Sequence, residues 1–159
     1  MKKKLLLIVI FYFALIISSY GAASSGSSGS SNYDKGATII KKGKKLEEKG
    51  KIEKANKRYE KALEYLIKSN KEKPNQPDTL NYLGFALRKL GNFEDAEKYY
   101  LLGLNIKPDH HGINEYLGEL YITTDRINLA KERLEVLKNC NCEEYNELKE
   151  VIEKNYSNY

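Results

Sequence analysis

The sequence has no tryptophan and little proline or phenylalanine: its 159 residues include three prolines, four phenylalanines and 13 tyrosines. Tyrosine therefore supplies most of the aromatic side chains. Charged residues make up 31% of the chain, and lysine and glutamate dominate among them. This composition favours helices over a β-sandwich. The length is that of one folded domain, which is large enough to bury a substantial core.

The chain also lacks a basic patch, although its net charge is +5. Lys2, Lys3 and Lys4 lie at the N-terminus, and without them 27 − 3 = 24 basic residues face 22 acidic ones. The remaining charges alternate in sign, as residues 44–49 illustrate. Such mixing cancels the long-range field that attracts a phosphate backbone, so we expect no nucleic-acid partner.

Motifs of catalysis are missing as well. The sequence has no glycine-rich phosphate loop, no nucleophile elbow and no zinc-binding helix motif, and its acidic residues are interspersed with lysines. The adjacent histidines His110 and His111 are far in sequence from Cys140 and Cys142, which does not match the spacing of a zinc site. We therefore predict that the protein is not an enzyme and has neither a cofactor nor a metal site.

The chain has one long apolar run, Leu5 to Ile17, of 13 residues. Because a membrane-spanning helix needs about 20 apolar residues, this run is short for a stable anchor. Lysines precede it and small residues follow it, which is the pattern of a signal peptide over residues 1–23, cut after Ala23. A cut after Gly21 and an uncleaved N-terminal anchor stay open. The residue directly after the cut is not a cysteine, which excludes attachment as a lipoprotein.

Either reading of the N-terminus predicts export, most simply to the periplasm of a Gram-negative bacterium. Residues 24–34 are predicted to be a disordered linker, because residues 24–31 are all serine or glycine and cannot bury apolar surface. The folded domain is expected to follow this linker.

An internal repeat of fixed length runs through the second half of the chain. Four pairs of residues share the same separation: Gly84 with Gly118, Leu83 with Leu117, Leu80 with Asn114, and Ala96 with Ala130. A small residue on each helix of a pair allows the two helices to approach closely. The turn between the helices is predicted at Gly91-Asn92 in one repeat and at Thr124-Asp125 in the next.

The spacing Leu80-x2-Leu83-Gly84-x2-Leu87, Ala96-x3-Tyr100 and Pro108 resembles the tetratricopeptide repeat, whose period of about 34 residues is the separation found here. The resemblance gives one repeat at residues 77–110 and a second at 111–142, where Cys142 replaces the proline. It implies an all-α fold of tandem helix-turn-helix repeats stacked as a right-handed solenoid.

An earlier repeat is predicted at residues 35–76. Gly43 and Tyr59 precede Gly84 and Tyr100 by 41 residues, seven more than the repeat length. Since seven residues are about two helical turns, the second helix of this repeat can run on toward Pro74 without changing its buried face. Residues 143–159 are predicted to form a capping helix. Three repeats meet the usual minimum for a stable stack.

The resemblance also implies where a partner binds, because the first helices of such repeats line a concave groove for peptides or helices. Aromatic residues and arginine tend to carry interface energy. Tyr82 and Tyr116 can equally be stacking residues, and Phe85 can be simply buried. Glu115 and Glu119 oppose an anion, so we do not expect the groove to hold a C-terminal carboxylate as some members do. The predicted groove residues are Lys44, Asn81, Tyr82, Phe85, Arg88, Glu115, Tyr116 and Glu119.

Cys140 and Cys142 leave three possibilities open. A disulfide between residues two apart closes a small, strained ring, so a structural disulfide, free thiols, and a redox or metal function all remain. The function we expect is that of a non-catalytic exported adaptor that binds a peptide or helix of another protein. The alternative is a constitutive structural subunit of a cell-envelope complex. The sequence does not predict the partner's identity or the oligomeric state.

Overall fold

The computed structural model describes residues 30–156, and these residues form seven α-helices and no strand. The predicted all-α fold class is confirmed. No helix of residues 30–156 combines the length and apolar character needed to cross a membrane. The predicted signal peptide and most of the predicted linker lie outside the described residues. The helices are α1 (Asn32–Glu47), α2 (Ile52–Glu72), α3 (Pro77–Lys89), α4 (Phe93–Ile106), α5 (His111–Thr123), α6 (Ile127–Leu137) and α7 (Glu143–Tyr156).

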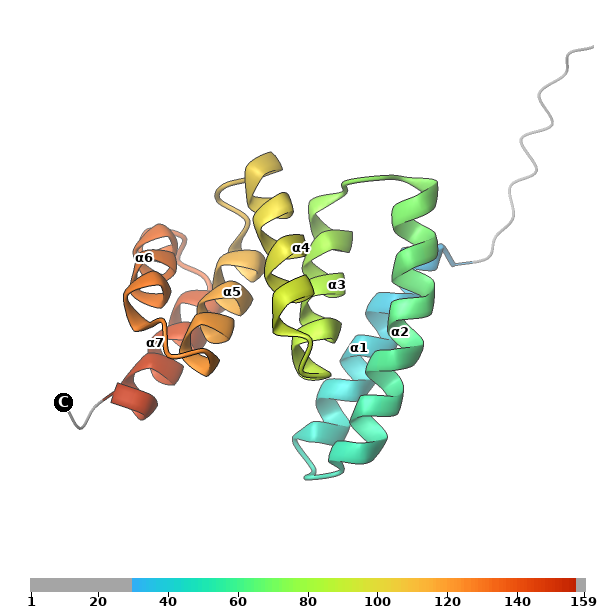
Figure 1. The fold of residues 1–159 in the computed structure, drawn as a ribbon, viewed down its shortest axis with the longest axis horizontal. Coiled ribbons are helices and arrows are strands. Elements are labelled where there is room, and N and C mark those ends of the chain that lie inside the picture. The colour runs from blue at the N-terminus through green and yellow to red at the C-terminus, as the bar shows by residue number, and fades with distance from the viewer. Residues whose placement is uncertain (1–29, 157–159) are drawn as a thin grey trace, which may run out of the picture.

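Neighbouring helices are arranged as stacked pairs. α1 packs with α2, α3 with α4 and α5 with α6, and the first helices of the pairs, α1, α3 and α5, also contact one another in an inner row. Figure 1 shows the pairs following one another in a curved row, with α1 and α2 at one end. At the other end α7 packs against α5 and α6. α7 therefore covers the last pair.

The three pairs turn at equivalent positions. Gly50, Gly91 and Asp125 have left-handed backbone conformations, with φ of 67°, 84° and 56°. Glycine adopts this conformation without steric cost, and aspartate tolerates it better than most residues. Asp125 follows Gly91 by the same separation that relates Gly118 to Gly84, so the repeat period is kept even where the glycine is replaced.

Glycines allow the two helices of the first and second pairs to approach closely. A Cβ added at Gly84 would lie 2.5 Å from Cε1 of Tyr100, and one added at Gly43 would collide with the ring of Tyr59. The glycine precedes the tyrosine by the same sequence separation in both pairs. This shared contact shows that the first pair is built like the second.

The first pair is longer than the second. α2 has 21 residues and α4 has 14, a difference of 21 − 14 = 7 that equals the excess in the sequence spacing. The added turns are packed, because Leu66 is buried and lies against Gly36 near the start of α1. The extension therefore adds core to the N-terminal end of the stack.

Helix α1 begins inside the segment predicted as linker, which extends to residue 34 in the sequence analysis. The Ser31 hydroxyl accepts a hydrogen bond from Asp34 N at 3.1 Å, and the Asp34 carboxylate accepts one from Ser31 N at 3.1 Å. This reciprocal capping box starts the helix at Asn32. The linker boundary is corrected accordingly: serine at position 31 belongs to the helix cap rather than to the tether.

Helix α7 caps the stack through one apolar side. Leu148 and Ile152 are buried, and Leu148 fills the space in front of Gly118 on α5, where an added Cβ would lie 2.6 Å from its methyl carbons. The small residue at position 118 thus receives the capping helix. This contact extends the core beyond the third pair.

The buried side chains form two clusters, one around α1–α3 and one around α4–α7. Tyr116 of α5 is half-buried and packs against both clusters. The two halves of the stack are therefore continuous at this tyrosine.

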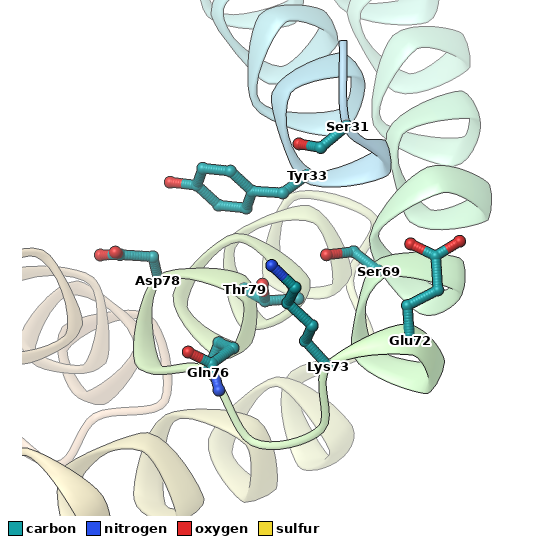
Figure 2. Close-up of a pocket in the computed structure, with 8 residues that line it drawn as sticks. All are labelled: Ser31, Tyr33, Ser69, Glu72, Lys73, Gln76, Asp78 and Thr79. Atoms are coloured by element: carbon teal, nitrogen blue, oxygen red, sulfur yellow. The ribbon is translucent and has the colours of Figure 1, made fainter. Parts of the chain in front are cut away.

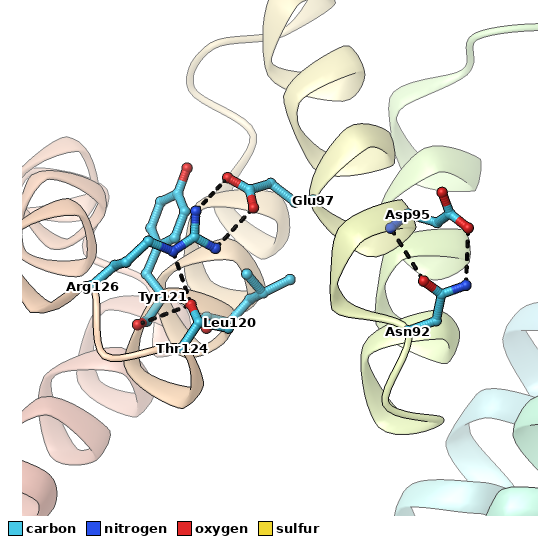
Figure 3. A network of polar contacts seen from close by, with 7 residues as sticks. All are labelled: Asn92, Asp95, Glu97, Leu120, Tyr121, Thr124 and Arg126. Carbon is cyan, nitrogen blue, oxygen red and sulfur yellow. Dashed lines mark hydrogen bonds and ion pairs between the residues drawn. The ribbon is translucent and has the colours of Figure 1, made fainter.

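A polar network also joins the second and third pairs (Figure 3). Arg126, in the turn before α6, donates two hydrogen bonds to Glu97 of α4, at 2.9 and 2.8 Å, and one to the Thr124 hydroxyl at 2.9 Å. Its guanidinium also lies 4.5 Å from the ring centroid of Tyr121. The Arg126–Glu97 ion pair is bidentate, which fixes the orientation of the two side chains as well as adding energy.

Candidate functional site

The predicted groove residues all lie on the inner row of helices, α1, α3 and α5. We call seven of these eight residues the inner face: Lys44 on α1, Tyr82, Phe85 and Arg88 on α3, and Glu115, Tyr116 and Glu119 on α5. Direct contacts join five of them, Lys44, Phe85, Arg88, Tyr116 and Glu119. Tyr82 packs against the same buried cluster as Tyr116. Burial raises the pKa of Glu115, and Glu119 is near enough for its carboxylate to raise that pKa further. The eighth, Asn81, packs elsewhere. Its amide nitrogen lies 2.9 Å from where a Cβ of Gly112 would be, and the side chain is buried between α3 and α5.

Two aromatic rings form the centre of the inner face. The centroids of Phe85 and Tyr116 are 4.8 Å apart, and Phe85 is only 1% exposed. Lys44 Nζ donates to the Tyr116 hydroxyl at 3.4 Å and lies 5.6 Å from the centroid of that ring. A cation over an aromatic ring is attracted by its quadrupole. The contacts bring together residues that are up to 72 positions apart.

A buried ion pair lies beside the rings. Arg88 is 8% exposed, and its guanidinium is 2.6 Å from Glu119 and 5.6 Å from the centroids of both Phe85 and Tyr116. Burial by itself lowers the pKa of Arg88, but the Glu119 carboxylate outweighs it and the pKa is raised. Arg88 therefore stays charged and holds Glu119 in place, instead of offering a free cation.

A second ion pair continues the row toward the ends of α1 and α3. Glu47 accepts hydrogen bonds from Lys89 and from the Tyr59 hydroxyl, each at 2.6 Å. Burial alone would raise the pKa of Glu47, but these two donors outweigh it and the pKa is lowered. The carboxylate is therefore ionised and fixed.

Glu115 behaves differently from the other acids on the inner face. It is 2% exposed, and burial, followed by the nearby carboxylates of Glu147 and Glu119, raises its pKa to about 10. At neutral pH this side chain is a neutral carboxylic acid. The sequence-based expectation that Glu115 opposes an anion is wrong, because burial removes the charge. Glu119 is charged, but Arg88 neutralises it.

The inner face therefore has a buried floor and an accessible layer. Phe85, Arg88 and Glu115 form the floor, because each is buried. The accessible layer is half-buried and consists of Lys44, Tyr82, Tyr116 and Glu119. Sequence periodicity placed these residues on one side, but it did not distinguish the two depths.

A tyrosine that the sequence reasoning missed extends the accessible layer. Tyr33 of α1 lies 6.0 Å from Tyr82, measured between ring centroids. Burial and the charge of Asp78 raise the pKa of Tyr33 to about 12, so its hydroxyl is protonated at neutral pH. Tyr33 and Lys44 are 11 residues apart, about three helical turns, so both lie on the same side of α1. This spacing could have predicted Tyr33, but residue 33 was assigned to the linker.

Tyr33 also lines a pocket of about 240 Å³ where the start of α1 meets the connection between α2 and α3. Figure 2 shows its lining side chains, which are mainly polar. Glu72 lines it too and accepts a hydrogen bond from Asn32 at 2.6 Å. The lining residues are Ser31, Tyr33, Ser69, Glu72, Lys73, Gln76, Asp78 and Thr79.

The cysteines lie away from the inner face, in the connection between α6 and α7. Cys140 and Cys142 are joined by a disulfide, with their Cα atoms 5.2 Å apart. The first residue of α5, His111, places a ring nitrogen within 4.8 Å of both sulfurs. No metal site was expected from the sequence, because His111 is distant from the two cysteines along the chain. The fold nevertheless gathers them into one cluster.

Residues 77–110 match the family model of the tetratricopeptide repeat. The match covers this one repeat, and the helix pairs on both sides of it stack in the same manner. No curated protein matches the sequence.

Several solved structures are similar to the chain. A tetratricopeptide repeat protein from Parabacteroides merdae is 18% identical, with a TM-score of 0.55 over 80% of this chain and 61% of that chain, so the present sequence spans less than two thirds of its length. The second such domain of Spaghetti (RPAP3), bound to an HSP90 peptide, is 18% identical, with a TM-score of 0.49 over 67% of this chain and 93% of that chain. The first domain of human RPAP3 is 19% identical, with a TM-score of 0.47 over 80% of this chain and 99% of that chain. At these identities the likeness concerns the fold.

Proposed function

We propose that the protein is an exported, non-catalytic adaptor whose inner face binds a peptide or helix of another protein. The observation that carries this proposal is the accessible layer of Lys44, Tyr82, Tyr116 and Glu119, which lies on a buried floor contributed by the same inner helices. Export and a periplasmic location rest on the N-terminal sequence pattern.

The floor favours binding because it pre-organises the side chains above it. Phe85 and Arg88 hold Tyr116 through ring and cation contacts, and Arg88 holds Glu119 through an ion pair. A partner therefore meets side chains that have already lost much of their rotational freedom, which reduces the cost of association. Tyrosine adds large contact area with few rotatable bonds, and this suits an interface centre.

The charges of the inner face indicate the chemistry of its partner. Arg88 pairs with Glu119 and Lys89 with Glu47, while Glu115 is neutral. No carboxylate of the described residues forms an ion pair with Lys44, whose contacts are aromatic. The inner face thus offers one positive charge beside tyrosine rings. The best-matched partner segment has an apolar or aromatic anchor next to an acidic side chain.

The alternative function, a constitutive subunit of an envelope complex, is favoured by the outer side of the stack. A groove of about 380 Å³ runs between α2 and α4 and is mostly apolar. Ile67 and Leu102 line it and are 43% and 39% exposed. An exposed apolar groove of this kind fits a subunit in which a neighbouring protein covers the groove permanently. The two functions therefore use different surfaces, because no inner-face residue lines this groove.

Crosslinking in intact cells separates the two functions. A photoreactive amino acid is placed at Tyr82 on the inner face or at Ile67 on the outer side of the full chain, and the crosslinked segment of the neighbour is sequenced. The adaptor proposal expects crosslinks from position 82 to one defined segment, with no such product from position 67. Crosslinks confined to position 67 would favour the structural subunit. Fractionation and the mass of the mature N-terminus test export and cleavage after Ala23.

A further inference from the structure

The cluster of His111, Cys140 and Cys142 combines three side chains that bind soft and borderline metal ions. One ring nitrogen and the two sulfurs all lie within 4.8 Å of one another. The imidazole is exposed and both cysteines are half-buried, so the cluster is reachable from solvent. It lies apart from the inner face.

The repeat architecture places these residues together. α5 and α6 are paired by a short turn, so the start of α5 lies beside the end of α6, where the connection to α7 begins. Asn141 has a left-handed conformation with φ of 51°, which asparagine tolerates. This conformation turns the chain between Cys140 and Cys142, whose sulfurs meet.

We propose that reduction of the Cys140–Cys142 disulfide creates a site for one thiophilic d10 metal ion, Zn²⁺ or Cu⁺, bound by both sulfurs and a ring nitrogen of His111. A dithiol reductant supplies two electrons and two protons and becomes a disulfide itself, while the S–S bond breaks to give two thiols. The metal then displaces the two thiol protons, which pass to solvent, and neutral imidazole completes the set.

The geometry requires only a small adjustment. Zn–S bonds of about 2.3 Å and Zn–N bonds of about 2.0 Å place tetrahedral ligand atoms roughly 3.5 to 3.8 Å apart. The ring nitrogen lies within 4.8 Å of both sulfurs and needs to approach by about 1 Å, while the two sulfurs, bonded in the disulfide, separate to roughly 3.8 Å on reduction. The exposed His111 side chain can rotate to supply this approach. Zn²⁺ takes a fourth ligand from water or from Glu144, which lines the same pocket as His111. Cu⁺ needs only the three ligands of the cluster.

The neighbouring histidine cannot substitute for His111. His110 is buried, its Nδ1 accepts a hydrogen bond from Ile113 N at 3.2 Å, and its Nε2 is 3.0 Å from Asp78. Both ring nitrogens are therefore occupied in holding the start of α5. This difference makes His111 the one imidazole of the described residues that can reach the sulfurs.

Metal titration of the reduced full chain tests the proposal. The disulfide is reduced anaerobically with a phosphine, which becomes its oxide by taking oxygen from water, and the phosphine is removed. Zn²⁺ and Cu⁺ are then titrated separately against a chromophoric chelator. We expect one metal per chain after reduction, and tighter binding of either ion identifies the preferred metal. The oxidised chain should bind at least about tenfold more weakly.

Variants make the test specific. His111→Ala should weaken binding about tenfold or more, and Cys140→Ser/Cys142→Ser should abolish it. Glu132→Gln, an exposed change on α6 outside the pocket that His111 lines, is the matched control and should bind like the wild type. Equal affinity in His111→Ala and wild type would overturn the site. So would a reduced chain that binds no more tightly than the double serine variant, or one whose circular dichroism shows loss of helix.

Discussion

At the scale of single residues, Glu115 couples the stability of the stack to pH. Its pKa is about 10 in the folded protein, against an ordinary value of 4.5, so the folded state keeps a proton that the unfolded state releases. Stability contributed by this group is therefore lost as pH rises from about 4.5 toward 10. A buried acid in this position destabilises the fold at neutral pH.

Replacing Glu115 with Gln removes this effect. Because each pKa unit corresponds to about 1.4 kcal/mol, Glu115→Gln should raise the free energy of unfolding by about 3–4 kcal/mol at pH 7 and by more at pH 9. At pH 4 the two proteins should be nearly equal. Urea unfolding followed by circular dichroism at these pH values provides the measurement. Glu60→Gln, an exposed change on α2, is the control. If the gain in unfolding free energy of Glu115→Gln over the wild type is no larger at pH 9 than at pH 4, the buried neutral acid is contradicted.

Gly84 is the second residue with a defined stability role, because the Tyr100 ring occupies the space of a side chain there. A Cβ at position 84 would lie 2.5 Å from Cε1 of a fully buried ring. Gly84→Ala should therefore cost about 1–3 kcal/mol despite its better helix propensity. Gly112→Ala is the matched control, since its Cβ meets only the end of the Asn81 side chain. Thermal unfolding that ranks Gly112→Ala as the more destabilised would refute this packing.

At the scale of helices, the Arg126–Glu97 ion pair joins the second and third helix pairs and couples their stabilities. The pair is partly buried and bidentate, so it should be worth more than an ordinary surface ion pair. Arg126→Ala should lower the free energy of unfolding by about 1–2 kcal/mol. A double-mutant cycle with Glu97→Gln measures the coupling. Lys98→Ala, which removes an exposed pair on α4, should cost less than about 0.5 kcal/mol, and purely additive effects of Arg126 and Glu97 would show that the repeats are not coupled here.

The helices themselves were predictable from local spacing. Gly43 precedes Tyr59 by the same separation as Gly84 precedes Tyr100, and this pattern reports helix pairing directly. Contacts between elements were less predictable. Leu148 of α7 packs against Gly118, and this contact depends on how the capping helix docks. The repeat period does not determine that docking.

Burial depth and distant clusters were the parts of the site that sequence could not provide. Periodicity placed Phe85 and Tyr116 on one side of their helices, but only packing shows that Phe85 is floor and Tyr116 is accessible. The neutral state of Glu115 follows from that packing too. His111 meets Cys140 because α5 and α6 are antiparallel, and their register is a tertiary property.

At the scale of the whole molecule, the stack presents different surfaces on its two sides. The inner side carries tyrosines and one free positive charge over a rigid floor, and the outer side carries an apolar groove between α2 and α4. The cysteine cluster lies at a third place, the junction of α5, α6 and α7. Because these regions do not overlap, binding, assembly and metal uptake can be tested separately.

The most direct test of the adaptor function is the affinity of the purified full chain for the partner segment that crosslinks to position 82, measured by calorimetry. Tyr82→Ala and Lys44→Glu should each weaken binding about tenfold or more, because one removes an aromatic contact and the other reverses the free charge. Ile67→Ser on the outer side should leave it unchanged. Unchanged affinity in both inner-face variants, with loss in Ile67→Ser, would contradict the inner face as the binding site.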